Sequence, residues 1–250
     1  MNISVPTGQG TFLCGLLLTS MACTEPTGPP DCDSTDDASC FRGVYRSLTG
    51  ARVADVETCA PELDGIDCVV SDENGSWKMP GLPLDSDVVL TSIHADSVPA
   101  LFPQTTTMDW YDWYKTPIPN WIMESHASRL GVELDPDRGH LLFIAWEGLN
   151  IDGIDTDPVE GVQATLCPEV DLLFYANSVG LVSEDATATS SLGQGGVINL
   201  EPGVYEISLD SPDGPCTEQM FHWEMTEEGT IPVPIRAGFT TAIDVMCPAP

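Results

Sequence analysis

Three aspartates in one short segment form the chain's best candidate for metal binding. Asp152, Asp155 and Asp157 are interleaved with a glycine, isoleucines and a threonine in residues 150–157. Hard cations such as Ca²⁺ bind several carboxylate and carbonyl oxygens around a tight turn. The spacing differs from that of an EF-hand loop, which also requires a glutamate at its twelfth position. The segment is therefore a candidate calcium site that needs ligands from other loops, and the simpler alternative is a solvated acidic loop.

Aromatic side chains gather in the middle of the chain, where they could contact a ligand. Of six tryptophans and five tyrosines, five lie within residues 110–121: Trp110, Tyr111, Trp113, Tyr114 and Trp121. An exposed aromatic ring can stack on a sugar or anchor a protein partner. The alternative is that these rings fill the space between two domains. Exposure of the three tryptophans would favour the ligand-binding interpretation.

Motifs of known enzymes are missing from the sequence. It has no His-Glu-x-x-His zinc motif, no Gly-x-Ser-x-Gly nucleophile turn and no phosphate-binding loop. We therefore expect a protein that is not an enzyme and needs no cofactor, calcium being the one exception considered. With 39 acidic residues, a hydrolase that uses a pair of carboxylates is the less favoured alternative. The net charge of −31 argues against nucleic acid as a partner, because phosphate binding requires Lys and Arg.

Nine cysteines without Cys-x-x-Cys spacing indicate disulfides and an oxidising compartment. Cys59 and Cys68 flank a proline and an Asp-Gly turn, as adjacent strands of a hairpin would, and they are the favoured pair. Cys167, Cys216 and Cys247 can supply one further bridge in the second half. Cys32 or Cys40 can attach the N-terminal segment to the folded part.

The N-terminus has the features of an export signal. Residues 11–22 form an apolar block that suits the core of a signal peptide and is followed at once by Cys23. Residues 24–37 are polar and rich in proline and aspartate. This order resembles bacterial lipoprotein precursors, which implies that Cys23 is acylated as the first residue of the mature chain. A plain secretory signal is the alternative, since residues 20–22 also fit ordinary cleavage.

Two stretches of the sequence repeat one another. Val53 and Val56 match Val159 and Val162 at an offset of 106 residues. A period of this length indicates a duplicated domain rather than a solenoid.

The local patterns around the repeat are those of β-strands. Residues 204–209 and 240–246 alternate apolar with other side chains, and residues 72–75 form a turn. Residues 231–235 alternate apolar residues with proline, which predicts an edge strand because proline cannot donate to a sheet.

The order of residues at 53–83, Val-x-x-Val then Asp-Glu-Asn-Gly-Ser-Trp then Gly-Leu-Pro, resembles the carboxypeptidase regulatory-like domain. That family is a transthyretin-like antiparallel β-sandwich, the non-catalytic companion of a metallopeptidase domain. The second half resembles a divergent copy. The resemblance implies a mainly β protein of two tandem antiparallel β-sandwiches, transthyretin-like or immunoglobulin-like.

We expect a short helix at about 120–130 to join the sandwiches and lie between them, with Asn120 as its cap and Gly131 at its end. The predicted parts are a signal peptide (1–22), a tether (23–40), a first sandwich (41–106), an aromatic linker with the helix (107–138) and a second sandwich (139–250).

The predicted function is that of an exported, lipid-anchored, non-enzymatic binding or structural module of the bacterial cell envelope. Its expected partners are a protein or glycan at the envelope and, through the lipid anchor, the membrane. The alternative function is a carbohydrate- or calcium-dependent adhesin, and the alternative location is periplasmic or secreted.

Overall fold

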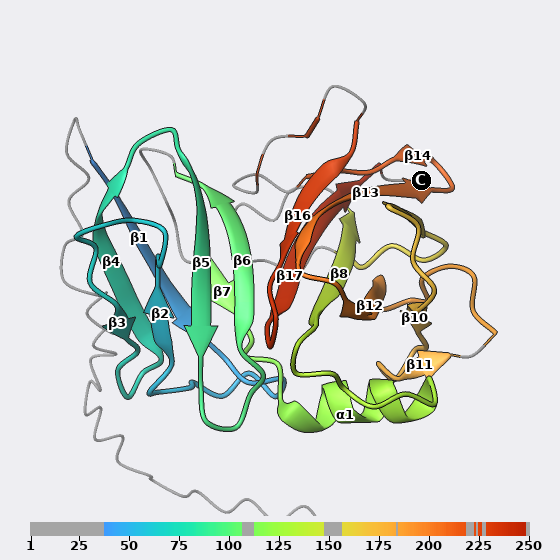
Figure 1. Cartoon of the computed structure of the whole chain (residues 1–250), viewed down its shortest axis with the longest axis horizontal. Helices are drawn as coiled ribbons and strands as arrows, with labels where there is room; N and C mark the ends of the chain where they lie inside the picture. The colour runs from blue at the N-terminus through green and yellow to red at the C-terminus, as the bar shows by residue number, and fades with distance from the viewer. Residues whose placement is uncertain are drawn as a thin grey trace, which may run out of the picture.

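The computed structural model describes residues 38–106, 113–147, 157–183, 185–218, 223, 225–226 and 229–248. Strands make up 50% of the chain and helix 5%, so the predicted mainly β class is confirmed. Figure 1 shows two β-sandwiches side by side, the first in blue to green and the second in yellow to red. Among the described residues, no helix is long and apolar enough to cross a membrane.

The first sandwich packs a three-stranded sheet against a second layer of four strands. The three-stranded sheet has the order β4 (Ser76–Pro83), β1 (Ala38–Tyr45), β7 (Trp113–Lys115). The other layer has the order β3 (Val69–Val70), β2 (Glu57–Cys59), β5 (Asp87–Ile93), β6 (Ala100–Thr105). Apolar side chains from both layers, among them Phe41, Trp77, Met79, Leu90 and Phe102, form the core between them.

The second sandwich is built in the same way. One layer has the order β11 (Val182–Ser183), β10 (Leu173–Ala176), β12 (Gln194–Leu200), β8 (Gly139–Glu147), β17 (Thr240–Cys247), and β15 (Thr217–Glu218) pairs with the end of β17. In the other layer β13 (Gly203–Ser211) lies between β16 (Ile231–Ile235) and both β9 (Gln163–Cys167) and β14 (Gly214–Pro215).

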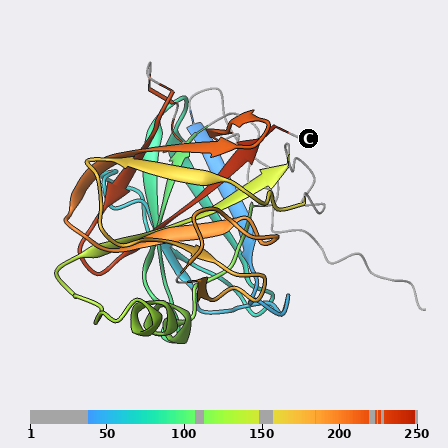
Figure 2. The same ribbon diagram turned by 90° about the vertical axis from the view of Figure 1, so that its right-hand side faces the viewer.

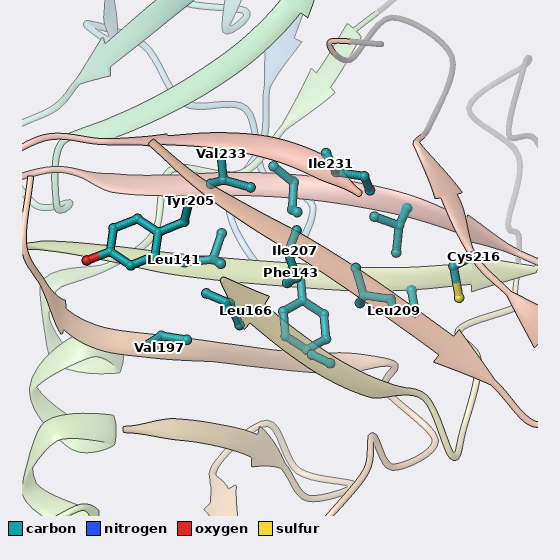
Figure 3. Close-up of a cluster of buried hydrophobic side chains, with 14 of the residues drawn as sticks. Leu141, Phe143, Leu166, Val197, Tyr205, Ile207, Leu209, Cys216, Ile231 and Val233 are labelled. Atoms are coloured by element: carbon teal, nitrogen blue, oxygen red, sulfur yellow. The ribbon is translucent and has the colours of Figure 1, made fainter. Parts of the chain in front are cut away.

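Figure 3 shows the second core, where side chains of the two layers point toward one another. Tyr205, Ile207 and Leu209 of β13 lie on the buried face, as the alternation predicted. They pack against Leu141 and Phe143 of β8 in the opposite layer.

Strand by strand, the two sandwiches correspond. β1 pairs antiparallel with β4 and parallel with β7, and β8 pairs in the same two ways with β12 and β17. In the opposite layers, β2–β5–β6 and β9–β13–β16 are both antiparallel. The repeat expected from the sequence is therefore present in the fold. The parallel pair in each sandwich departs from the predicted all-antiparallel arrangement, because the chain crosses to the opposite layer after β6 and after β16.

In the first sandwich, a buried hydroxyl group forms hydrogen bonds with both valines of the repeat. Ser71 Oγ accepts a hydrogen bond from Val56 N at 3.0 Å and donates one to Val53 O at 3.0 Å. Ser71 is 3% exposed. The side chain therefore satisfies two backbone groups that are shielded from water.

Thr189 makes the same two bonds in the second sandwich. Its Oγ1 accepts from Val162 N at 2.9 Å and donates to Val159 O at 2.8 Å. The valines that matched at an offset of 106 residues are thus bound by equivalent hydroxyl groups. The repeat is therefore present in the hydrogen bonds of the two sandwiches as well as in the sequence.

Replacing Thr189 with valine is expected to lower the free energy of unfolding by roughly 2–3 kcal/mol, because Val162 N and Val159 O lose their partner. Thr189→Ser keeps the hydroxyl and serves as the control, with a much smaller loss. Urea unfolding of the two variants measures the difference. Equal midpoints would contradict the role assigned to the hydroxyl.

The two sandwiches also share one sheet, which the sequence did not indicate. β17 pairs along its length with β8, and its first residues, Thr240 and Thr241, pair in parallel with Ala100 and Leu101 of β6. A ten-stranded sheet therefore runs from β11 of the second sandwich to β3 of the first.

The predicted helix, α1, spans Asn120–Arg129. Its N-cap is Pro119 rather than Asn120, and no side chain caps it, while Gly131 follows its end with a positive φ of 70°. Met123 and Ala127 pack against strands β10, β11 and β12. The helix therefore lies below the second sandwich and not between the two, as both views show (Figures 1 and 2).

Candidate functional site at the junction of the sandwiches

The predicted calcium segment falls almost wholly outside the described residues. Asp152 and Asp155 lie in 148–156, and only Asp157 is described, as an exposed residue. The calcium site stays a prediction. Elsewhere in the described chain, one group of metal-type ligands lies close together, Glu57 with Cys59 and Cys68. Its two sulfurs are bound to each other and offer no thiolate.

The aromatic cluster is described only in part. Trp110 and Tyr111 lie outside the described residues, and the backbones of Trp113 and Tyr114 form β7. Trp121 stands in the first turn of α1 with 58% of its surface exposed. Its exposure is what a ligand-binding ring needs, and the cluster as a ligand site stays a prediction.

The structure contains the disulfide favoured by the sequence, Cys59–Cys68, which closes the segment between β2 and β3. In the second half Cys216 is joined to Cys247, and the third candidate there, Cys167, is an exposed free thiol. Cys40 is disulfide-bonded as well. Cys23 and Cys32 lie outside the described residues.

A largely buried ion pair joins the sandwiches beside the shared sheet. Lys115 of β7 binds Asp244 of β17, and the two side chains are only 10% and 19% exposed. Trp146 Nε1 donates to the other carboxylate oxygen of Asp244 at 3.0 Å. The Lys115 ammonium also lies 5.4 Å from the centre of the Phe102 ring. Each charge is thus compensated by an opposite charge and a further polar or aromatic contact, as burial of ions requires.

Sequence reasoning missed this pair because Lys115 and Asp244 are separated by 129 positions. One signal was available. The chain has only eight cationic residues, and Lys115 directly follows two aromatic residues, Trp113 and Tyr114. Nothing in the sequence identified Asp244 among 39 acidic residues.

A pocket of about 400 Å³ opens at the same junction. Its walls come from the β2–β3 segment, from β5 and from the turn between β16 and β17, and they include Leu63, Ile66, Ile93 and Phe239. Arg236 is its one charged lining residue, and this guanidinium binds Glu62 across the junction. Both side chains of this second ion pair are partly exposed, so it contributes little stability.

Two histidines are buried, His126 on α1 and His140 on β8. His140 Nδ1 accepts a hydrogen bond from Asn199 N at 3.1 Å, and burial lowers the pKa of His140 to about 4. His126 Nε2 lies 3.1 Å from Gly180 O, and burial also lowers the pKa of His126. The structure therefore places both rings where the charged form is disfavoured, which suits packing rather than acid–base catalysis near neutral pH.

The free energy of unfolding is expected to fall by up to roughly 3 kcal/mol as the pH drops from about 6.5 to 4, through His140 alone. The unfolded chain takes up a proton near pH 6.5, whereas folded His140 resists protonation until about pH 4. His126 acts in the same direction. Urea midpoints measured between pH 7.5 and 4.5 test this. His140→Asn offers an amide oxygen to Asn199 N, and its profile should be flatter; an unchanged profile would contradict the assignment.

Comparisons with known proteins give distant likenesses only. No protein-family model matches the chain, so the resemblance to the carboxypeptidase regulatory-like domain is not confirmed. No curated protein matches it either.

Among solved structures, the Bacillus anthracis TIE protein is 10% identical over 84% of this chain and 34% of its own, with a TM-score of 0.26. A Streptococcal ancillary pilin is 13% identical over 85% of this chain and 63% of its own, with a TM-score of 0.24. A double mutant of the shaft pilin SpaA from Lactobacillus rhamnosus GG is 10% identical over 85% of this chain and 98% of its own, with a TM-score of 0.26. This chain thus spans about a third of the first protein and less than two thirds of the second. At these TM-scores the likeness supports no functional conclusion.

Proposed function

We propose that this chain is an exported, lipid-anchored module of the cell envelope that acts by structure or binding and not by catalysis. The observation that carries the proposal is the pair of disulfides, Cys59–Cys68 and Cys216–Cys247, in a fold that begins shortly after Cys23. Disulfides form and persist in oxidising compartments outside the cytosol. Cys23 itself follows an apolar block of signal-peptide length.

The charge and the junction support a module that does not catalyse. A net charge of −31 keeps a surface protein soluble and prevents nonspecific adhesion to anionic polymers. At the junction, Lys115 and Asp244 are already bound to each other, and the pocket lining is mainly apolar. An ion pair and an apolar pocket can hold two domains together or contact a partner, but they are poorly suited to proton transfer.

Intact mass of the protein from its native host tests the proposal. We expect a mature chain that begins at Cys23 and carries added acyl mass, and a Cys23→Ser variant that lacks this mass. An unacylated chain beginning at Cys23 would replace the anchor with secretion or a periplasmic location. A chain that retains Met1 would overturn export.

A second candidate function is a carbohydrate- or calcium-dependent adhesin. The 58% exposure of Trp121 favours it, because a ring that is open to solvent is available to stack on a sugar. Titration with soluble glycans, with and without Ca²⁺, should quench tryptophan fluorescence if this function is present. Trp121→Ala should remove the quenching, and a response that persists in this variant would exclude Trp121 as the contact.

A further inference from the structure

β17 contributes to both sandwiches. Besides its pairing with β6, Thr240 N donates to Pro99 O at 2.8 Å, and Ala242 packs against the core of the first sandwich. Trp223, also from the second half, donates from Nε1 to Val88 O of β5 at 3.3 Å. The sandwiches therefore meet through backbone pairing, apolar packing and side-chain hydrogen bonds at once.

The extent of strand pairing at the junction is set by a proline. Thr240 and Thr241 pair with Ala100 and Leu101, and the ladder then ends. Backbone groups of alternate residues along a strand face the same neighbour, so the nitrogen of Pro103, two residues after Leu101, also faces β17. This nitrogen carries no proton, and it cannot donate a hydrogen bond to β17. Strand pairing between β17 and β6 is therefore limited to two residue pairs, and side chains supply the other contacts of the junction.

The Lys115–Asp244 ion pair lies beyond the last residues that pair between β17 and β6. Asp244 lies beyond Thr241 on the same strand, and Lys115 reaches it from the three-stranded sheet of the first sandwich. Removal of one partner of such a pair leaves a charge shielded from water without compensation, which is strongly destabilising.

We propose that the two sandwiches form one rigid, cooperatively unfolding body and that Lys115 with Asp244 is the latch that couples them. The body lies along the long axis of the molecule, with β1 beginning at its left end and β10 and β14 at its right (Figure 1). It therefore acts as a stiff spacer that holds the second sandwich at a fixed angle beyond the first. The spacer role rests on the proposed function, because it needs the anchor at Cys23, whereas the rigidity does not.

Calorimetry of the full chain carrying Cys23→Ser tests the latch independently of acylation. We expect one transition, with equal calorimetric and van 't Hoff enthalpies for the whole folded part. Lys115→Met should split this transition, with the second sandwich melting about 5–10 °C lower. Arg129→Met removes the same charge from an exposed position on α1 and should leave one transition.

Two transitions in the parent chain would overturn the single rigid body. A Lys115→Met profile that matches that of Arg129→Met would overturn the latch. If Lys115→Met does not fold, ¹⁵N relaxation of the parent chain decides instead. One rotational correlation time shared by both sandwiches is expected, and two distinct times would overturn the proposal.

Discussion

Replacing Gly75 with alanine is expected to lower the free energy of unfolding by roughly 4 kcal/mol. Gly75 has a φ of 70°, and an added Cβ would lie 2.5 Å from Tyr45 O and 3.1 Å from Val53 N. These backbone atoms cannot move away, because Tyr45 N donates to Gly75 O and Val53 N donates to Tyr45 O. The alanine therefore adds a steric clash to an unfavourable backbone conformation. Urea unfolding measures the loss.

Gly65→Ala is the matched control for this prediction. Gly65 has a similar φ of 83°, but no atom lies within 4 Å of its added Cβ. Only the conformational cost of about 1 kcal/mol should remain. Gly193 is the equivalent of Gly75 in the second sandwich, with Ala145 O 2.4 Å from an added Cβ, and Gly193→Ala should repeat the large loss. Equal losses at Gly75 and Gly65 would refute the steric argument.

Removing the Cys216–Cys247 disulfide by a double substitution to alanine is expected to cost about 3.7 kcal/mol, from the chain entropy of the loop it closes. These cysteines are 31 positions apart, whereas Cys59 and Cys68 are 9 apart, for which the same relation gives about 2.6 kcal/mol. Denaturant unfolding of the two double variants measures both losses.

The solvent exposure of the cysteines provides a second test, the order in which the two disulfides are reduced. Cys216 and Cys247 are each 3% exposed, whereas Cys68 is exposed. Mild reductant should therefore open Cys59–Cys68 first, which mass spectrometry after thiol alkylation detects. Earlier opening of Cys216–Cys247, or a larger loss from the shorter loop, would contradict the prediction.

The strands and the repeat could be predicted because they depend on neighbours in sequence. Alternation placed Tyr205 and Ile207 on the core face, and the prolines placed residues 231–235 at an edge. The junction could not be predicted, because it depends on which distant strands meet. Nothing local in β17 says that Thr240 pairs with Ala100, and helix α1 lies under the second sandwich because its apolar face fits there.

In the candidate site, too, contacts between residues close in sequence could be predicted and contacts between distant residues could not. The Cys59–Cys68 pair could be predicted, since a short segment with a turn brings the two residues together. The choice between Cys167 and Cys216 as the partner of Cys247 could not, because both belong to the same half and only the fold brings one of them to β17. Lys115 and Asp244 carry no sequence pattern that links them.

The two prolines of β16 have a consequence for how copies of this protein can meet. Pro232 and Pro234 are two residues apart, so their backbone groups face the same side of β16. Thr241 Oγ1 donates to Pro234 O, and this side is therefore the one that faces away from β13. Pro234 is buried, and at Pro232, which is partly exposed, a strand from a neighbouring molecule would find no amide proton. Many copies can therefore stand close together without their sheets joining into aggregates along this edge.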